Sequence, residues 1–215
     1  MVPGVNEYSP RWRTVFGEPA AKRTEAEVEF LLRVLPLPRY RRVLDVPCGA
    51  GRHAGALRDL GYDVLGVDND PAVSPQVLCD LRELDVLPVD FDAAINMWAS
   101  FGYFDATENE RVLASLARRL RPGGRLVLDL FNRVFFEGRD GERELRPGVV
   151  ERSWVTGGRR RCEIDHGDGQ VDVFEWQLYS ADELEELAAR SSLRPVERDA
   201  RPSEPSMRLV LQLDG

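Results

Sequence analysis

The sequence predicts an α/β fold in which a doubly wound, mostly parallel seven-stranded sheet carries an antiparallel β insertion after its fifth strand. Short apolar segments alternate with amphipathic segments of helical period as far as Phe131, a pattern typical of strands joined by crossover helices. After Asn132 the segments alternate residue by residue and are separated by Gly157-Gly158 and by 167–169, as in antiparallel hairpins. One more helix and two strands follow. The 215 residues suffice for one such domain.

The N-terminal segment 1–40 is predicted to be helical in its second half. Thr24 and Glu27 have the spacing of a capping box, and apolar residues follow at helical intervals until Pro36. The residues before it read as irregular, with three aromatic side chains as candidate packing anchors: Tyr8, Trp12 and Phe16.

Five strands of the parallel part are predicted from their short apolar stretches. They span residues 43–46, 64–68, 76–80, 91–97 and 125–131. Helices are predicted over 52–60 and after a second capping-box pair, Thr107 and Glu110. The connection 69–75 is short and contains two prolines, so a full crossover helix would not fit there.

The predicted insertion covers residues 137–178, with strands at 149–156, 159–165 and 171–178. A capping box at Ser180 and Glu183 opens the next helix, and strands 196–199 and 207–213 complete the sheet. The chain is therefore expected to form one domain over 1–215. The insertion, with its aromatic residues, could be a lid over a site or the surface of a homodimer. These aromatic residues are Trp154, Phe174 and Trp176.

The charge balance argues against several classes of function. The chain has 29 Lys and Arg residues against 37 Asp and Glu, a net charge of −8, whereas nucleic-acid binders usually present a basic face. No apolar run approaches the roughly 18 residues of a membrane span, and residues 1–13 lack the apolar core of a secretory signal. We therefore expect a cytoplasmic protein with neither nucleic acid nor membrane as partner.

Cysteine and histidine are too few and too scattered for a metal centre. Three cysteines, without CxxC spacing, favour neither a disulfide framework nor a structural zinc site, and only two histidines are present. These residues are Cys48, Cys79, Cys162, His53 and His166. No metal is expected.

The turn after the first predicted strand carries the strongest chemical signal. Gly49 and Gly51 would let a ligand approach the backbone and the start of the next helix. With Ala54 they also match the dinucleotide pattern G-x-G-x-x-A, so a nicotinamide-dependent oxidoreductase is one interpretation. Asp45 favours a cationic ligand instead, because two like charges ~4 Å apart at an effective dielectric of about 20 cost on the order of 4 kcal/mol. A pyrophosphate would meet that repulsion, whereas S-adenosylmethionine would not.

Two further aspartates end predicted strands. Asp68 suits the ribose hydroxyls of either cofactor and does not discriminate between them. Asp80 could accept a hydrogen bond from an adenine amino group.

Several segments, in this order, resemble class I S-adenosylmethionine-dependent methyltransferases of small molecules. They are residues 45–53 (DVPCGAGRH), 61–68 (GYDVLGVD), 79–84 (CDLREL), 91–97 with 100–104, 120–126 (LRPGGRL) and 178–184 (LYSADEL). The match runs over about 43–190, and its order is more specific than any single motif. The resemblance implies a Rossmann-like methyltransferase fold and S-adenosylmethionine as cofactor.

By this resemblance the methionine part of the cofactor would lie near Asp45, the ribose near Asp68 and the adenine near Asp80. The methyl group would lie beside residues 96–98, and the acceptor beside 100–104. The full predicted cofactor set is Asp45, Pro47, Cys48, Gly49, Ala50, Gly51, Asp68, Asn69, Asp80, Leu81, Asn96, Met97 and Trp98. Pro47 departs from the family pattern, where a glycine is commoner, which is tolerable if that position needs no positive φ.

The resulting hypothesis is methyl transfer to an O, N or C nucleophile of a small molecule. No residue stands out as a general base. His53, Tyr103 and His166 are the candidates, and each also has a simpler explanation as a packing, pocket-wall or solvated residue. A protein that binds the cofactor without transferring methyl groups therefore stays open as a further alternative. Arg23 could pair with the cofactor carboxylate or simply lie on the surface.

Overall fold

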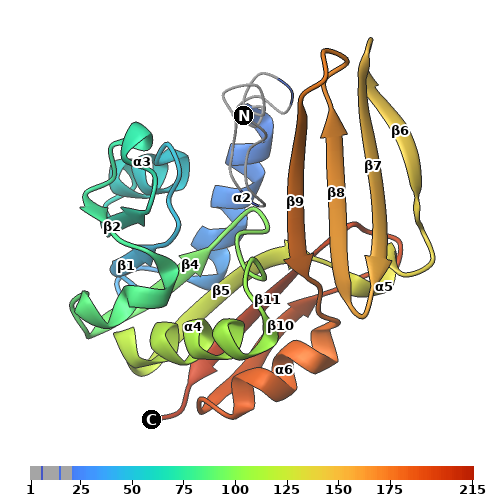
Figure 1. The fold of residues 1–215 in the computed structure, drawn as a ribbon. Coiled ribbons are helices and arrows are strands. Elements are labelled where there is room, and N and C mark those ends of the chain that lie inside the picture. Colours follow the sequence, from blue (N-terminus) through green and yellow to red (C-terminus); the bar gives the residue numbers. More distant parts are fainter. Residues whose placement is uncertain (1–5, 7–14, 16–20) are drawn as a thin grey trace.

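The computed structural model describes residues 6, 15 and 21–215 (Figure 1). Its main sheet has seven strands in the order β10-β11-β5-β4-β1-β2-β3. The strands are β1 (Arg42–Asp45), β2 (Asp63–Asp68), β3 (Val77–Leu78), β4 (Phe91–Asn96), β5 (Leu120–Phe131), β10 (Leu193–Asp199) and β11 (Ser206–Leu213). Neighbouring strands are parallel except β11, which is antiparallel to both β5 and β10. The predicted fold class is confirmed.

Helices cover both faces of this sheet (Figure 1). They are α2 (Ala21–Val34), α3 (Arg52–Asp59), α4 (Ala106–Arg119), α5 (Arg133–Phe136) and α6 (Ala181–Ala189). Val43 faces the α2 and α3 side, where it packs with Leu31 and Leu57. Leu44, its neighbour in β1, points to the opposite side and packs with Leu116 of α4. Alternate residues of a strand point to opposite faces, so a strand covered on both sides is apolar throughout.

The connection after β2 is as short as its prolines predict. It contains a single 3-10 turn, η1 (Pro71–Val73), and leads into β3, which is shorter than the predicted 76–80. A second 3-10 segment, η2 (Leu81–Val86), follows. The connections on either side of β3 therefore lack the α-helix that joins β1 to β2 and β4 to β5.

Two of the three predicted helix caps are wrong. Thr24 lies inside α2, which already runs at Ala21, and its hydroxyl accepts from Arg52 rather than from its own helix. Thr107 lies inside α4, where Asp105 is the N-cap and accepts from the Glu108 backbone N–H at 2.8 Å. Both threonines have capping-box spacing. In α4 the aspartate at the N-cap accepts instead, and α2 has already begun before Thr24. The third prediction, a capping box at residues 180 and 183, is confirmed.

The insertion is a separate antiparallel sheet between β5 and α6, as predicted, but it has four strands instead of three. They are β6 (Gly141–Arg146), β7 (Val149–Thr156), β8 (Arg159–Asp165) and β9 (Val171–Gln177), paired in that order. The sequence gives no apolar signal for β6, because GERELR is an exposed, highly charged edge strand. Such charges protect an open edge from pairing with other chains.

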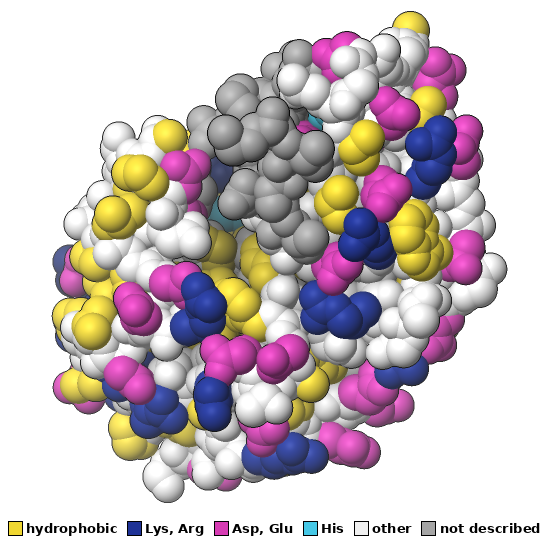
Figure 2. All heavy atoms as spheres, in the orientation of Figure 1, with side chains coloured by type: hydrophobic (Ala, Val, Ile, Leu, Met, Phe, Trp, Pro, Cys, Tyr) yellow, Lys and Arg dark blue, Asp and Glu magenta, His cyan; other side chains and the backbone are white. Residues whose placement is uncertain are grey.

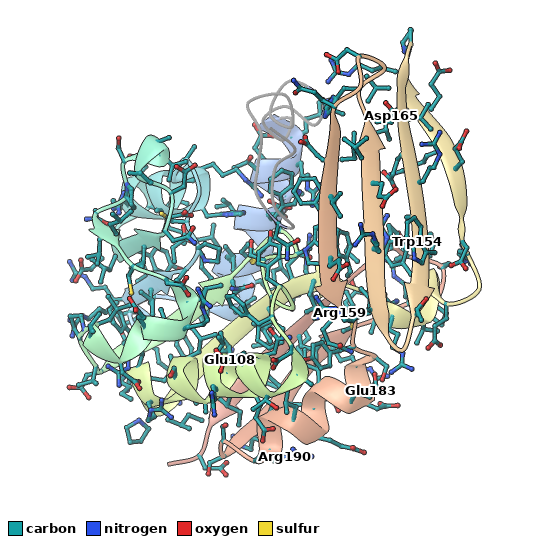
Figure 3. The ribbon with its side chains drawn as sticks, in the orientation of Figure 1. Glu108, Trp154, Arg159, Asp165, Glu183 and Arg190 are labelled. Atoms are coloured by element: carbon teal, nitrogen blue, oxygen red, sulfur yellow. The ribbon has the colours of Figure 1, made fainter. Side chains whose placement is uncertain are left out.

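The insertion is joined to the main sheet at one end. Arg159 lies at the junction and Asp165 at the free end of β8 (Figure 3). The Arg159 guanidinium donates to the Phe104 carbonyl at 2.9 Å, and the Gln177 backbone N–H donates to the Gly102 carbonyl at 2.7 Å. These contacts orient the insertion over the edge where β4 and β5 end. Among the described residues, no helix is long and apolar enough to cross a bilayer.

Candidate functional site

A cavity of about 1320 Å³ opens at the carboxyl ends of β1, β2, β4 and β5 and continues along the inner face of the insertion. The carboxyl edge is where open α/β sheets bind their ligands. Ten of the predicted cofactor residues line it: Pro47, Cys48, Gly49, Ala50, Asp68, Asn69, Asp80, Leu81, Met97 and Trp98. Asp45, Gly51 and Asn96 are not among its lining residues. The volume exceeds the usual ligand pocket of roughly 300–1,000 Å³, so it has room for a cofactor and a second molecule.

The glycine turn between β1 and α3 is open toward a ligand. Gly49 and Gly51 have φ angles of 52° and 77°, which favour glycine, and among the described residues no atom beyond the adjoining chain lies within 4 Å of where either would carry a Cβ. Asp68 fixes the turn from β2, since its Oδ2 accepts from the Gly49 N–H at 2.8 Å. Its Oδ1 accepts from the Asp70 N–H at 2.9 Å. Each oxygen keeps a second lone pair for a hydroxyl group.

Asp45 lies beneath this turn and is almost fully buried. Neither of its oxygens makes a hydrogen bond of normal geometry with the described residues. Burial raises the pKa of Asp45 to about 6, although His53, the Ala54 backbone N–H and Arg52 partly offset that effect. A buried carboxylate without partners is destabilising by itself and favours a nearby cation.

His53 belongs to a buried ion-pair network centred on Glu27 of α2. Its Nε2 lies 2.9 Å from Glu27 Oε2, and Arg52 contacts the same oxygen, while Arg23 Nε reaches Oε1 at 2.8 Å. Burial alone would raise the pKa of Glu27, but the hydrogen bonds from His53, Arg23 and Arg52 outweigh it and hold that pKa well below its ordinary value. His53 therefore ties α3 to α2, a structural role that competes with any role as a base.

Arg52 and Arg23 add positive charge beside the glycine turn. Both line the cavity, and the Arg52 Nη2 atom is buried without a hydrogen-bond partner among the described residues. The Arg23 guanidinium also lies 5.8 Å from the ring centre of Trp98. These arginines are suited to the carboxylate of an amino-acid-like ligand. For Arg23 both interpretations stay predictions, since it lines the cavity while its side chain is also half exposed and bonded to Glu27.

The predicted adenine side has a carboxylate already engaged by an arginine. Asp80 accepts from the Nε of Arg82 at 2.9 Å and from its Nη2 at 2.8 Å, and it also caps η2. The hydrogen bonds from Arg82 lower the pKa of Asp80. Arg82 in turn lies 4.9 Å from the ring centre of Phe104. Asp80 remains at the cavity wall, but with less capacity to accept from a ligand than an unpaired carboxylate.

The turn after β4 is strained and held from β5. Trp98 and Ala99 have φ angles of 62° and 56°, in the left-handed region that residues other than glycine seldom adopt. Asp129 holds both, because its Oδ2 accepts from the Trp98 N–H at 3.2 Å and its carbonyl accepts from the Ala99 N–H at 2.8 Å. Burial raises the pKa of Asp129, and Arg208 partly offsets that effect. Asp129 also lines the cavity.

Asp129 is a site residue that the sequence analysis missed. A signal was present, because Asp129 is a lone carboxylate in the apolar stretch of β5 near its carboxyl end. In a parallel sheet such a position faces the ligand edge. Asn96, which was predicted, is fully buried instead and donates to the Val46 carbonyl at 2.8 Å. It supports the first strand rather than lining the cavity.

The other two candidate bases, Tyr103 and His166, differ in whether they reach the cavity. Tyr103 lines the cavity, with its ring 6.1 Å from that of Trp176. His166 does not, and its Nε2 lies 2.9 Å from the buried Asp172 carboxylate in the insertion. Cys48 is no nucleophile, since burial and the charges of Asp45 and Asp68 raise its pKa to about 12. The described residues contain no group of three or more potential metal ligands.

The insertion contributes a second group of cavity residues, of which the sequence pointed only to Phe174 and Trp176. Residues on the inner face of β7, β8 and β9 line the cavity beside aromatic side chains from β5 and α5. They are Glu151, Ser153, Arg160, Cys162, Ile164, Phe174 and Trp176. Trp154, by contrast, is not among the lining residues, and Figure 3 shows it on β7, the strand beyond β8. Only the tertiary pairing of the hairpins places their alternate residues on this one wall.

Comparison with known proteins identifies the family. A family model described as "Methyltransferase domain" matches residues 16–197. The chain belongs to this methyltransferase domain family. The predicted resemblance is therefore confirmed, and family membership decides against the nicotinamide oxidoreductase interpretation.

Individual relatives are more distant. The methyltransferase domain is 29% identical over 141 residues to a glycine/sarcosine N-methyltransferase of Parasynechococcus marenigrum, covering 58% of this chain and 49% of that protein. It is 30% identical over 145 residues to the mouse glycine N-methyltransferase, covering 55% and 49%. The chain thus spans about half the length of the curated relatives that it matches.

Solved structures share the fold over most of the chain. The methyltransferase CcbJ from Streptomyces caelestis superposes with a TM-score of 0.73 at 19% identity, covering 89% of this chain and 90% of its own. The sugar N-methyltransferase KedS8 from Streptoalloteichus gives a TM-score of 0.71 at 23% identity, covering 100% and 99%. At these identities the likeness concerns the fold.

Proposed function

We propose that this methyltransferase domain transfers a methyl group from S-adenosylmethionine to an O, N or C nucleophile of a small molecule. The observation that carries the proposal is the buried Asp45 carboxylate, which lies beneath an open glycine turn and whose oxygens make no hydrogen bond of normal geometry with the described residues. That arrangement suits a ligand with cationic groups and would repel a pyrophosphate.

The residues present fit this cofactor. Gly49 and Gly51 leave open space before the turn, and Asp68 keeps lone pairs for ribose hydroxyls. Asp45 supplies negative charge below the turn, and Arg52 offers a buried N–H for the carboxylate of the methionine part. When bound, the cofactor would supply a methyl group already activated on a sulfonium.

The contribution of the chain would be alignment and exclusion of water. Trp98 and Ala99, fixed by Asp129, form a rigid wall at the end of β4. Tyr103 and the inner face of the insertion close the opposite side. Alignment of two reactants in a dry site can account for roughly 7–11 kcal/mol of a barrier, by analogy with intramolecular reactions. A nitrogen acceptor needs no strong base, which agrees with the lack of an obvious one.

The names of the relatives support a small molecule as the methyl acceptor. Proteins named as glycine, sarcosine and sugar N-methyltransferases are among those that resemble this chain. A small-molecule acceptor is also consistent with the net charge of −8. On the face drawn in Figure 2, basic and acidic side chains are interspersed, without a continuous basic area that would suit a nucleic acid. A cytoplasmic location and a homodimer remain predictions.

Calorimetric titration with S-adenosylmethionine, S-adenosylhomocysteine, NAD and NADP tests the proposal. We expect saturable binding of the first two compounds only, and turnover in a screen of small amines and phenols. Binding of a nicotinamide nucleotide instead would overturn the cofactor assignment. Binding of S-adenosylmethionine without turnover over a broad panel would favour the alternative of a cofactor-binding protein without transfer activity.

A further inference from the structure

The part of the cavity that lies against the insertion differs in chemistry from the cofactor side. Its walls are aromatic, formed by residues from β5, α5 and β9. Phe131 meets Trp176 edge to face with ring centres 5.1 Å apart, and it meets Phe136 at 5.4 Å. Phe174 stacks on Trp176 at 5.8 Å. Rings at these distances and angles present both faces and edges to a flat ligand.

Arg160 is fixed in the middle of this aromatic group. Its guanidinium carbon lies 4.4 Å from the ring centre of Phe136, 5.3 Å from that of Phe131 and 5.8 Å from that of Trp176. It is 6% exposed, and its Nη2 donates to Glu151 Oε1 at 2.8 Å. Its position is therefore set by packing and by one ion pair before any ligand binds.

Arginines outnumber carboxylates where the insertion lines the cavity. Glu151 is shared, because its Oε2 accepts from Arg143 Nη2 at 2.7 Å while its Oε1 accepts from Arg160. Glu142, also at the wall, is paired with Arg152, which does not line the cavity. One buried carboxylate therefore serves two guanidinium groups, the buried Arg160 and the largely exposed Arg143, and a ligand anion between them would be a second negative partner.

Two buried donors of the same group have no acceptor. The Nε of Arg160 and the Nε1 of Trp176 are both buried without a hydrogen-bond partner among the described residues. Buried N–H groups in native proteins are nearly always satisfied, so such donors indicate an acceptor that a ligand brings. Both residues line the cavity and lie in contact with each other.

We propose that this pocket binds the methyl acceptor, and that the acceptor is a planar aromatic molecule bearing a carboxylate. The ring lies against the aromatic wall formed by Phe131, Phe136 and Trp176, and the carboxylate faces Arg160 and Arg143. The inference rests on the proposed function, because it assigns the occupant of the second half of the same cavity.

Binding measured on protein saturated with S-adenosylhomocysteine tests this without requiring turnover. The probes are 2-naphthoate, its uncharged isostere 2-naphthamide, and the non-aromatic cyclohexanecarboxylate. We expect 2-naphthoate to bind at least tenfold more tightly than either of the others. Equal or tighter binding of the amide would overturn the anionic class, and equal or tighter binding of cyclohexanecarboxylate would overturn the aromatic one.

Three variants locate the site. Arg143→Gln, at an exposed position, should reduce the preference for naphthoate over the amide about fivefold, whereas the control Arg194→Gln, an exposed arginine of β10 that does not line the cavity, should leave that preference unchanged. Trp176→Phe keeps the ring but removes an unsatisfied donor, so the protein should stay folded while naphthoate binds about fivefold more weakly. Unchanged naphthoate binding in both Arg143→Gln and Trp176→Phe would overturn the assignment.

These measurements distinguish a failure of the proposed function from a failure of the acceptor assignment. If S-adenosylhomocysteine does not bind, the proposed function fails, and naphthoate binding to the protein alone still decides the nature of the pocket. If S-adenosylhomocysteine binds but naphthoate does not, the cofactor assignment holds and the acceptor assignment is wrong.

Discussion

At the scale of single residues, the site contains a carboxylate, that of Asp45, whose burial destabilises the folded protein when it is ionised. Asp45 is buried, and its pKa of about 6 lies well above the ordinary value of about 3.9. The native state therefore holds the proton more tightly than the unfolded chain does. As pH rises from about 4 to 6, the native protein loses roughly 3 kcal/mol of stability through this group, and the loss is complete above pH 6. A bound cation would relieve it.

We expect Asp45→Asn to be more stable than the parent protein at pH 7.5, by about 1–3 kcal/mol, because it removes a buried charge without changing the shape of the side chain. The difference should shrink at pH 4, where the parent Asp45 is protonated. Affinity for S-adenosylmethionine should fall at least tenfold. Thermal unfolding and calorimetry measure the two effects, with the exposed Asp63→Asn as control. A less stable Asp45→Asn protein at pH 7.5 would contradict the reasoning.

At the scale of elements, β5 determines the shape of the turn that follows β4. Trp98 and Ala99 are held in left-handed conformations, which cost of order 1–3 kcal/mol each in general, and Asp129 holds them through one side-chain and one backbone hydrogen bond. The side chain thus stabilises a strained wall of the cavity. Its second oxygen lies 3.6 Å from Arg208.

Two substitutions separate the hydrogen bond of Asp129 from its charge. Asp129→Ala leaves the Trp98 N–H unsatisfied and should lower the free energy of unfolding by about 1–3 kcal/mol. Asp129→Asn keeps an acceptor oxygen and removes a buried charge, so it should be at least as stable as the parent protein. Chemical denaturation of both variants measures the difference. Equal stability of the alanine and parent proteins would show that the turn does not need this bond.

Prediction from sequence worked well for elements with strong local patterns. The buried strands β1, β4 and β5 and the capping box at Ser180 were identified, because apolar runs and caps are local signals. The caps predicted at Thr24 and Thr107 were wrong, because the same spacing also occurs inside helices: α2 already includes Ala21, and Asp105 caps α4. The strand β6 was missed, because a charged edge strand is stabilised by its neighbour and not by its own pattern.

At the scale of the whole molecule, the insertion and the main sheet share one aromatic core. Cys162, Ile164 and Phe174 pack together with Phe131 from β5 and Tyr103 from the loop after β4. A four-stranded sheet of this size is marginal without such a contact. The insertion is therefore expected to depend on the main sheet for its stability.

We expect both sheets to unfold in a single cooperative transition. Hydrogen exchange followed by mass spectrometry at increasing denaturant should show peptides from β7 to β9 losing protection together with peptides from β4 and β5. Peptides from η1 and β3, whose connections contain no α-helix, serve as a comparison and should exchange earlier. Loss of protection in the insertion at distinctly lower denaturant would contradict the shared core.

Local sequence patterns predict the α/β class, most of the elements in their order, the family and the glycine turn with Asp45 and Asp68. These are encoded by periods and motifs over a few neighbouring residues. Three features appear only in the folded chain: Asp129 fixes the turn of Trp98, His53 is tied to Glu27, and an aromatic pocket centred on Arg160 adjoins the cofactor side. The first two rest on hydrogen bonds between residues 31 and 26 positions apart, and the pocket combines residues of β5, α5 and the insertion. Strand register and packing, which no local pattern specifies, bring these residues together.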